Sequence, residues 1–276
     1  IGLSLNMATR VYVLPCIAGH VGADAAGAVL AEALQNSEEM TLLIDVGTNA
    51  EIILGNRHHL MAASSPTGPA FEGAQISAGQ RAAVGAIERV RINPNSYEPR
   101  FKVIGSDNWS DSLEFQEDVK KTGITGICGS GIIEILAELY LSGIISEDGV
   151  INGELSSKTK RIEKIGRTFQ YRVTDQIVIT QTDVRAIQLA KAALYAGFQL
   201  LMDKMGVEKV DKIILAGAFG THIDPRYAMI LGMVPDCSFT SVTSVGNSAG
   251  AGARLALLSI DKRLEIENLV KKIEKI

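Results

Sequence analysis

The amino-acid sequence predicts an α/β protein in which helices flank a mixed β-sheet. Short apolar runs separated by Gly-rich turns indicate strand hairpins, above all at residues 41–64. Two long segments, 132–145 and 182–207, carry apolar residues every three to four positions, which is typical of amphipathic helices. Because 46% of the 276 residues are hydrophobic, the chain can bury a sizeable core.

The N-terminal part of the chain is predicted to contain one helix and several short strands. Residues 11–15 (VYVLP) predict a strand, and the Gly- and Ala-rich segment after them leads into a helix that ends near Gln35. Residues 41–64 predict three strands. A tight Gly turn separates the first two of these, and a hairpin at Gly55-Asn56 precedes the third.

The middle of the chain combines strands with polar connections. Residues 86–92 and 99–105 predict two further strands. The acidic stretch 106–119 is expected to be a solvated loop. Trp109 in this loop could contact a partner, because a lone aromatic side chain in a polar loop often anchors an interface. The locally basic segment 154–172 is predicted to be an exposed excursion.

Helices dominate the C-terminal part. Thr182 or Asp183 is expected to cap the longest helix and Gly206 to end it. Residues 212–220 (KIILAGAFG) predict a buried strand that ends in a Gly-rich turn. A short strand and a small-residue turn follow, and the last predicted helix runs to Ile276.

Composition and charge exclude several classes of protein. A formal charge of −4 leaves no basic field for nucleic acid. Cys16, Cys128 and Cys237 lie too far apart for a metal or iron–sulfur motif, and we expect Cys128 to be a buried, inert thiol. No apolar stretch is long enough for a membrane span, so we expect no membrane partner. Together with the net charge, this leads us to expect a cytoplasmic protein without a nucleic-acid partner. Because the first residue is Ile1, we expect residues 1–276 to be a single-domain piece of a longer polypeptide.

The sharpest chemical signal is the sequence Asp45-Val46-Gly47-Thr48-Asn49, which ends one predicted strand and turns into the next. Gly47 allows backbone amides to approach a phosphate closely, and Thr48 and Asn49 add side-chain donors. Asp45 can hold Mg²⁺ through water or orient an attacking water. The same residues also fit an ordinary hairpin whose Asp and Asn only satisfy turn amides, so the residues alone leave both interpretations open.

Three more Gly-rich turns add to this signal. Small residues at 217–220 and 246–252 permit close approach to a nucleotide, or merely close packing of a helix against a strand. Residues 129–131 (Gly-Ser-Gly) begin a helix, where free N–H groups and the helix dipole favour an anion. Neither a P-loop nor a GxGxxG motif after the first strand is present.

The order of these motifs matches a known arrangement. A strand–DxGTN–strand hairpin is followed by FEGA at 71–74, LAGAFG at 215–220, and GNSAGAG at 246–252 before a final helix. This order resembles the ATPase superfamily of actin, sugar kinases and heat-shock chaperones. The resemblance implies, in turn, a phosphate-binding hairpin, a Gly-Glu loop, an adenosine motif and a second connecting helix, with GHVGAD at 19–24 as the first connecting segment. Since only one phosphate hairpin is present, it implies an actin/chaperone-ATPase-like (ribonuclease H-like) half-fold.

One branch of the superfamily matches over nearly the whole chain. Stretches such as LLIDVGTNAEIILGN, SSPTGPAFEGAQIS and LAGAFGTHIDPRYAMILGMVPDC resemble the C-terminal domain of ATP-dependent reductive activators of corrinoid proteins. Those activators use an iron–sulfur domain to return cob(II)alamin to cob(I)alamin, coupled to ATP. The resemblance implies ATP or ADP with Mg²⁺ as cofactors, and a corrinoid protein or methyltransferase as partner. It also implies a homodimer and an iron–sulfur cluster in the parent protein but not in this chain.

The resemblance assigns roles to individual residues. Asp45 and Glu72 would be catalytic, and Asp45 would also be the Mg²⁺ ligand. Two alternatives stay open: a small-metabolite kinase of the same superfamily, or a non-enzymatic module for nucleotide sensing, partner docking and dimerisation. With half of the nucleotide site missing, we expect the isolated chain to be inactive or weakly active. The implied nucleotide-binding residues are Gly47, Thr48, Asn49, Gly129, Ser130, Gly131, Gly217, Ala218, Phe219, Gly220, Gly246 and Asn247.

Overall fold

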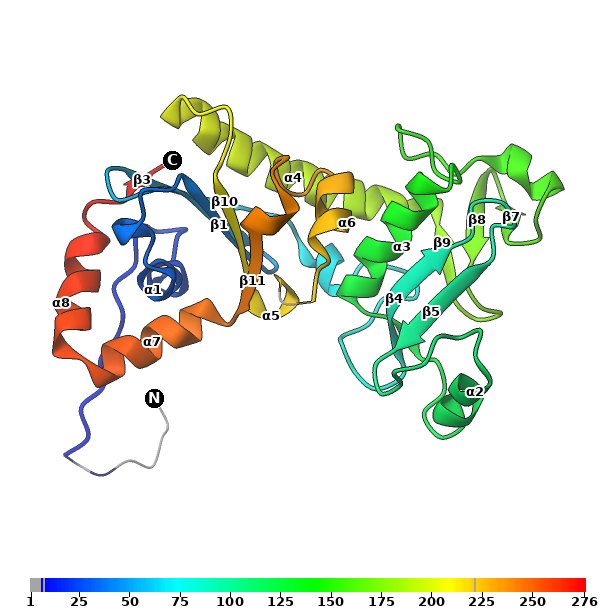
Figure 1. Cartoon of the computed structure of the whole chain (residues 1–276), viewed down its shortest axis with the longest axis horizontal. Helices are drawn as coiled ribbons and strands as arrows, with labels where there is room; N and C mark the ends of the chain where they lie inside the picture. The colour runs from blue at the N-terminus through cyan, green and yellow to red at the C-terminus, as the bar shows by residue number, and fades with distance from the viewer. Residues whose placement is uncertain (1–5, 7, 221) are drawn as a thin grey trace.

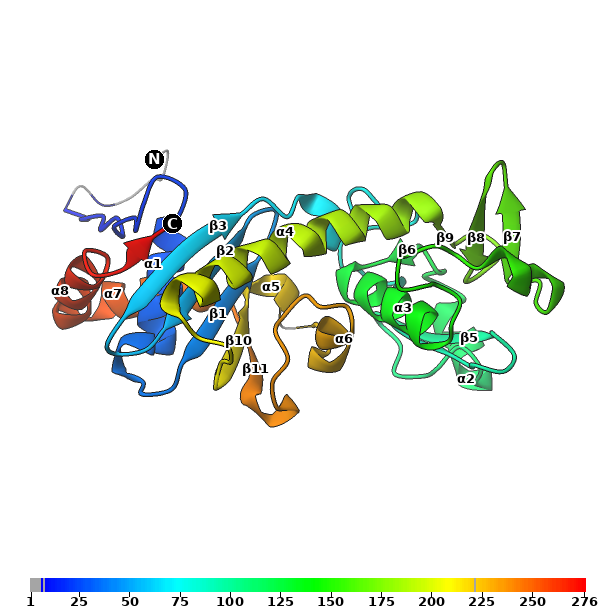
Figure 2. The ribbon, with the colours of Figure 1, turned by 90° about the horizontal axis from the view of Figure 1, so that it is seen from above.

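The molecule is elongated, and a six-stranded mixed sheet fills one end of it (Figure 1 and Figure 2). We call this end the sheet lobe, and the opposite end, formed by residues 86–180, the cap lobe. This computed structural model describes residue 6, residues 8–220 and residues 222–276, apart from the side chains of Ala218 and Phe219. The strands of the large sheet, in spatial order, are β11 (Val242–Gly246), β10 (Lys212–Ala216), β1 (Thr41–Val46), β2 (Ala50–Gly55), β3 (Leu60–Ser65) and β12 (Glu274–Lys275).

Both faces of the large sheet are buried. Strands β1, β2 and β3 form an antiparallel meander, and β10 adds to β1 in parallel. Because side chains alternate along a strand, Leu42 and Ile44 share one face while Leu43 lies on the other. Helices α1 (Ala23–Glu32) and α8 (Ile260–Leu269) cover the Leu43 face, and α4 (Gln181–Met205) covers the opposite one.

Helix α7 (Ser248–Leu258) crosses α1 at a very close approach (Figure 1). A Cβ added to Gly252 would lie 2.0 Å from the carbonyl oxygen of Gly27, so only glycine fits at this crossing. Ser248 Oγ donates a hydrogen bond to Glu32 Oε1 over 2.6 Å and links the same two helices. The small residues of the GNSAGAG motif therefore serve helix packing at this point.

The cap lobe is built on α3 (Gly129–Leu141), which packs against β4 (Ala86–Ile92). Figure 2 shows α4 running along the molecule from the sheet lobe toward the cap lobe, and one apolar cluster continues from the α4 face of the sheet into the cap lobe. The remaining elements are β5 (Pro99–Val103), β6 (Gly126–Ile127), β7 (Ile162–Ile165), β8 (Thr168–Arg172), β9 (Val178–Thr180), α2 (Leu113–Val119), α5 (Gly217–Gly220), α6 (Pro225–Ile230) and the 3₁₀ turns η1 (Leu34–Asn36), η2 (Pro69–Glu72), η3 (Gly153–Ser157) and η4 (Phe239–Ser241).

The structure confirms the α/β class, the mixed sheet and the hairpins between residues 41 and 65. The strand predicted at 11–15 is wrong. Val11 and Val13 are 58% and 79% exposed, and no neighbouring strand pairs with this segment within the described residues. Tyr12 instead hydrogen-bonds through its hydroxyl to Glu267 at 3.0 Å. Alternating apolar residues in a short segment therefore do not make a β-strand unless a neighbouring strand pairs with it.

Three further boundaries differ from the predictions. The acidic stretch 106–119 contains helix α2, because Ser112 caps Phe115 N and the Phe115 ring packs against Phe101. The last helix breaks at Ser259, whose extended backbone starts α8 as a new N-cap. Thr180 is the N-cap of α4 in place of Thr182, and Asp183 completes the capping box by accepting a hydrogen bond from Thr180 N; Gly206 ends that helix as expected. In each case a side chain with a local acceptor or donor sets the boundary.

Candidate functional site

Three of the Gly-rich turns lie side by side at the carboxyl ends of neighbouring strands in the large sheet. Strands β1, β10 and β11 are parallel, so their carboxyl ends point the same way. Asp45 at the end of β1 is opposite Ala216 of β10, which is in turn opposite Gly246 of β11. Loops that follow the carboxyl ends of parallel strands are the usual place for a ligand in an open α/β sheet.

The backbone carbonyl groups of the turn between β1 and β2 accept hydrogen bonds from the neighbouring loop at residues 67–68. Thr67 Oγ1 donates to the carbonyls of Gly47 and Thr48 at 2.9 and 3.1 Å, and Gly68 N donates to Thr48 O at 2.9 Å. The backbone N–H groups of Thr48 and Asn49 donate to no acceptor in the part of the chain that the structure describes. A rigid turn with unused amides is an anion-binding geometry.

Asp45 is more than half buried beside this turn and accepts no hydrogen bond from the described residues. Burial, with a smaller contribution from the Asp24 carboxylate, raises the pKa of Asp45 above its ordinary value. A Cβ at Gly217, whose φ is +87°, would lie 2.5 Å from Asp45 Oδ1. Glycine at position 217 therefore leaves the space that the Asp45 carboxylate occupies.

Glu72, to which only the family resemblance assigned a role, reaches the same turn from the 3₁₀ turn η2. Thr48 Oγ1 donates a hydrogen bond of 2.8 Å to Glu72 Oε1. This contact connects the hairpin turn to the cavity between the two lobes, which Glu72 also lines.

This cavity, the inter-lobe cleft, has a volume of about 500 Å³. Gly129 and Ser130 line it at the N-terminus of α3, where no side chain caps the helix. Cys128 is 2% exposed, and its thiol donates to the Ile87 carbonyl, which confirms that it is buried. The uncapped N–H groups and the helix dipole favour a negatively charged group at this end of the cleft. The other lining residues are Arg81, Ala82, Glu88, Ile104 and His222.

A second cavity of about 860 Å³ lies on the other side of the hairpin turn. Asn49 and Glu51 line it together with Asp24 from the start of α1. Burial, and to a lesser degree the charges of Asp24 and Asp45, raise the pKa of Glu51 to about 7. Lys275 also lines this cavity, so the hairpin turn borders a cavity of mixed charge through Asn49 and is linked to the inter-lobe cleft through Thr48 and Glu72.

Several predicted nucleotide-binding residues have structural duties. A Cβ on Gly131 would lie 2.3 Å from the Ile87 carbonyl oxygen, so this glycine allows α3 to pack on β4. Asn247 Oδ1 caps α7 by accepting from Gly250 N at 2.7 Å. Gly220 is buried within α5, directly after β10. The side chains of Ala218 and Phe219 lie outside what the structure describes, so their predicted contacts with adenosine stay predictions.

The structure adds residues that the sequence did not single out. Arg89 of β4 donates to Glu134 Oε1 at 2.7 Å and to the His222 carbonyl at 3.3 Å, so it connects the cap lobe to the segment after LAGAFG. Tyr227, which follows in α6, donates through its hydroxyl to the buried Glu138 of α3. Arg89 lies outside the quoted motifs, and Tyr227 lies within LAGAFGTHIDPRYAMILGMVPDC but has no role assigned from the sequence, because both residues act through partners far away in the chain.

The ring of Trp109 contacts basic side chains of the same chain. The cationic groups of Arg91, Arg100 and Lys102 lie 5.7, 4.9 and 5.5 Å from its ring centroid. Such distances are typical of cation–π contacts. The indole therefore packs under three basic side chains, and its predicted role as a partner contact stays a prediction.

The side chains around Asp45 suit a Mg²⁺ ion that is bound together with a phosphate, and do not suit a metal ion whose ligands all come from the protein. Mg²⁺ usually keeps several waters and takes one or two carboxylates together with phosphate oxygens. Among the described residues, no group of three His, Cys, Asp or Glu side chains converges on one point. Asp45, beside unused backbone amides, fits a cation that arrives with a phosphate.

A search for membrane-spanning segments among the described residues found no helix with the length and apolar character needed to cross a bilayer. The longest helix, α4, has 25 residues, and it carries charged side chains at both of its ends. This result is in keeping with the sequence, which contains no apolar stretch of that length.

Comparison with known proteins identifies a sequence family and similar proteins. The sequence family described as the C-terminal domain of RACo, the ASKHA domain, matches residues 39–276. The corrinoid activation enzyme RamQ of Eubacterium limosum is 37% identical over 272 residues, which cover 93% of this chain and 43% of that protein. The Co(II) methylated amine-specific corrinoid protein reductase of Methanosarcina barkeri is 28% identical over 274 residues, covering 96% and 47%.

A solved structure agrees with these sequence relatives. A reductive activator for corrinoid,iron-sulfur protein superposes with a TM-score of 0.83 at 34% identity, over 96% of this chain and 41% of that chain. The present chain therefore spans less than half the length of each of these proteins.

Proposed function

Because the chain belongs to the family of C-terminal ASKHA domains represented by RACo, we propose that it is the nucleotide-binding domain of an ATP-dependent reductive activator. In that role it would help to return cob(II)alamin to cob(I)alamin in a corrinoid methyl-transfer protein. The observation that carries this proposal is the hydrogen bond between Thr48 and Glu72, which joins the phosphate-type hairpin to the inter-lobe cleft. The corrinoid-related names of the relatives support the choice of partner.

In this proposal, different parts of the chain bind different parts of Mg·ATP. The inter-lobe cleft takes the adenosine and the nearest phosphate, against the N-terminus of α3 and the segment after β10. The amides of Thr48 and Asn49 take the outer phosphates. Asp45 holds Mg²⁺ directly or through water, and Glu72, fixed by Thr48, orients the attacking water. Bound Mg·ATP would supply the free energy that an uphill reduction of the corrinoid needs.

Coupling to a partner requires that nucleotide binding changes the molecule. The cleft lies between two lobes, and Arg89 bridges them by contacting both Glu134 and the His222 carbonyl. A nucleotide that binds one arrangement of the lobes more tightly shifts the population toward that arrangement. The protein could then bind and release its partner in step with nucleotide turnover.

We also propose the setting in which this domain works. Residues 1–276 form a C-terminal domain of a longer protein whose own iron–sulfur domain donates the electron in cis. The parent protein is a cytoplasmic homodimer, and its partner is a corrinoid protein or methyltransferase. The lengths of the reported relatives, each more than twice that of the matched region, support the part of this setting that concerns a longer parent protein.

Isothermal titration of the purified chain with Mg·ADP and Mg·ATP tests the nucleotide site. We expect micromolar to low-millimolar binding that Asp45→Ala weakens about tenfold or more, since tenfold corresponds to about 1.4 kcal/mol. Asp175→Ala is the matched control, because Asp175 is exposed in the turn between β8 and β9. Equal affinities for both variants would overturn the placement of the nucleotide on the hairpin.

Two other results would replace the proposal with one of its alternatives. Phosphotransfer from ATP to a small sugar or acid would identify a kinase of the same superfamily. Binding without turnover in the full-length parent protein, whatever the corrinoid partner, would identify a nucleotide-sensing and docking module. Hydrolysis assays of the parent protein with and without a corrinoid protein separate these cases.

A further inference from the structure

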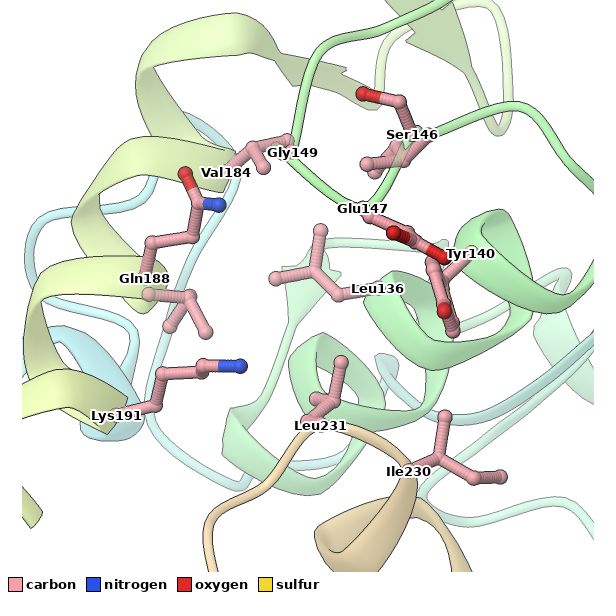
Figure 3. A pocket seen from close by; sticks show the side chains of 12 residues that line it. Leu136, Tyr140, Ser146, Glu147, Gly149, Val184, Gln188, Lys191, Ile230 and Leu231 are labelled. Atoms are coloured by element: carbon pink, nitrogen blue, oxygen red, sulfur yellow. The ribbon is translucent and has the colours of Figure 1, made fainter. Parts of the chain in front are cut away.

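A separate cavity lies between α3, α4 and α6 (Figure 3). Its volume is about 340 Å³, which is within the range of small-molecule sites. Leu136 of α3, Ile187 of α4 and the end of α6 at Ile230 and Leu231 contribute apolar surface to its wall, and residues of the loop at 145–149 line one side. We call this cavity the helix pocket.

One ammonium group points into this apolar space. Figure 3 shows Lys191 extending from α4 toward Leu231. Its Nζ makes no hydrogen bond or ion pair with any residue that the structure describes. Burial lowers the pKa of Lys191 below its ordinary value, and no carboxylate offsets that effect. An amine that loses water without gaining a partner is costly to the fold.

The other polar groups of the helix pocket do not compensate this charge. Gln188 is already engaged, since Nε2 donates to the Asp148 carbonyl at 3.2 Å and Oε1 accepts from Arg185 at 2.6 Å. Glu147 lies across the pocket, is exposed, and forms no ion pair with Lys191 in the described structure (Figure 3). Lys191 is therefore the unmatched charge inside the pocket.

We propose that the helix pocket binds a small apolar monocarboxylate. The ligand's carboxylate would pair with Lys191 Nζ, and its hydrocarbon chain would lie against Leu136, Ile187 and Leu231. Lys191 is the one cationic side chain among the lining residues, beside the neutral hydroxyls of Tyr140 and Ser146, so the pocket suits one negative charge, whereas a phosphate group requires several charged donors. Pairing in a partly buried site also strengthens the charge–charge attraction, because water screens it less.

Occupation of the helix pocket would also affect the nucleotide site, and this effect alone rests on the proposed function. Helix α6 follows the LAGAFG turn closely, and Tyr227 of α6 bonds Glu138 of α3. A ligand between these helices restrains both the cap lobe and the segment that borders the inter-lobe cleft. By thermodynamic linkage, the bound carboxylate would change the affinity for nucleotide by a certain factor, and bound nucleotide would change the affinity for the carboxylate by the same factor.

Isothermal titration with sodium octanoate, in the absence of nucleotide, tests the proposal on the purified 276-residue chain. We expect saturable binding to one site. Lys191→Met keeps the apolar stem and should weaken the affinity at least tenfold, whereas Lys204→Met, an exposed lysine farther along α4, should leave it unchanged. Shorter carboxylates should bind about fourfold more weakly for each methylene removed.

Further probes make the outcome decisive. Leu231→Phe narrows the helix pocket without changing charge and should also weaken binding, and urea unfolding of each variant checks that it is folded. Octanamide, which has the same length but no charge, should bind at least tenfold more weakly than octanoate. Equal affinity for the two probes, equal affinity of Lys191→Met, or no saturable binding would each overturn the proposal. Because no nucleotide is present, the result does not depend on whether the inter-lobe cleft binds ATP.

Discussion

Glu134 in the cap lobe and Asp45 in the sheet lobe are both withdrawn from water, but their surroundings differ sharply. Glu134 is 1% exposed and accepts hydrogen bonds from Arg89, Arg91 and the Val90 amide. Asp45 accepts none from the described residues, and burial and a neighbouring carboxylate raise its pKa. The first carboxylate holds a helix against a sheet, and the second is left without compensation at the end of a strand.

The same contrast extends to other acidic residues. Asp183 accepts from Ser77 and Thr180 through both backbone and side chain, and it is 2% exposed. Glu51, like Asp45, lies beside the hairpin turn, and its pKa is raised to about 7. Buried carboxylates with full sets of donors are structural, whereas under-compensated ones in a cleft are candidates for binding an external cation or ligand.

The largest expected effect comes from removing a compensated carboxylate. Glu134→Ala leaves Arg89, Arg91 and a buried amide without their acceptor, and it opens a cavity in the cap lobe. We expect the free energy of unfolding to fall by about 3 to 5 kcal/mol, measured by urea denaturation. Glu114→Ala in the exposed first turn of α2 is the control. A loss below about 1 kcal/mol would break the distinction between the two groups of carboxylates.

A smaller loss is expected at the start of α4. Asp183→Ala removes the reciprocal capping box with Thr180 and the two bonds from Ser77. We expect a loss of about 2 to 3 kcal/mol, because a cap contributes about 1 kcal/mol and buried donors are left unpaired. Thermal unfolding followed by circular dichroism measures it. An unchanged midpoint would show that the Ser77 contacts are dispensable.

Glu51 should respond to pH in the opposite sense from an ordinary paired carboxylate. Its folded pKa is about 7, above its unfolded value near 4.5. The folded state therefore binds the proton more tightly, so stability decreases as pH rises from about 4.5 to 7 and is level above that window. Because the carboxyl is partly exposed, we expect on the order of 1 kcal/mol. Glu51→Gln should remove this dependence in urea titrations at pH 5 and pH 8; a variant with the same slope as wild type would assign the effect elsewhere.

The smallest expected change is a gain. Asp45→Asn removes an under-compensated charge at almost constant volume, so we expect the unfolding free energy at pH 7 to rise by about 0.5 kcal/mol. The same variant should bind Mg·ADP more weakly. A loss of stability comparable with that of Asp183→Ala would place Asp45 in the structural group.

Local sequence signals predicted the elements that depend on local chemistry. The hairpins of β1 to β3 follow from apolar runs and tight turns, and α4 follows from its apolar periodicity. The approach of Glu72 to Thr48 was expected only from the resemblance to a family, since they lie in different loops. The bridge from Arg89 to Glu134 and the His222 carbonyl could not be predicted, because three distant segments meet there. Long-range partners likewise decide that residues 11–15 are not a strand.

The large sheet is assembled from segments that are far apart in the chain. Thr41 of β1 pairs with Lys212 of β10, and β12 joins the opposite edge only at Glu274. The cap lobe, in contrast, comes from the contiguous stretch 86–180. During synthesis on the ribosome, that stretch can collapse early on local contacts, while the β1 hairpin must wait for β10 to emerge.

This order has a consequence for quality control in the cell. Until β10 and β11 arrive, β1 presents an open edge to other chains. The DVGTN turn and its neighbour LAGAFG come together only in the last stages of folding, when β10 docks beside β1. A ligand that binds at these turns would therefore discriminate finished molecules from nascent ones, and it would stabilise the chain only after β10 has docked.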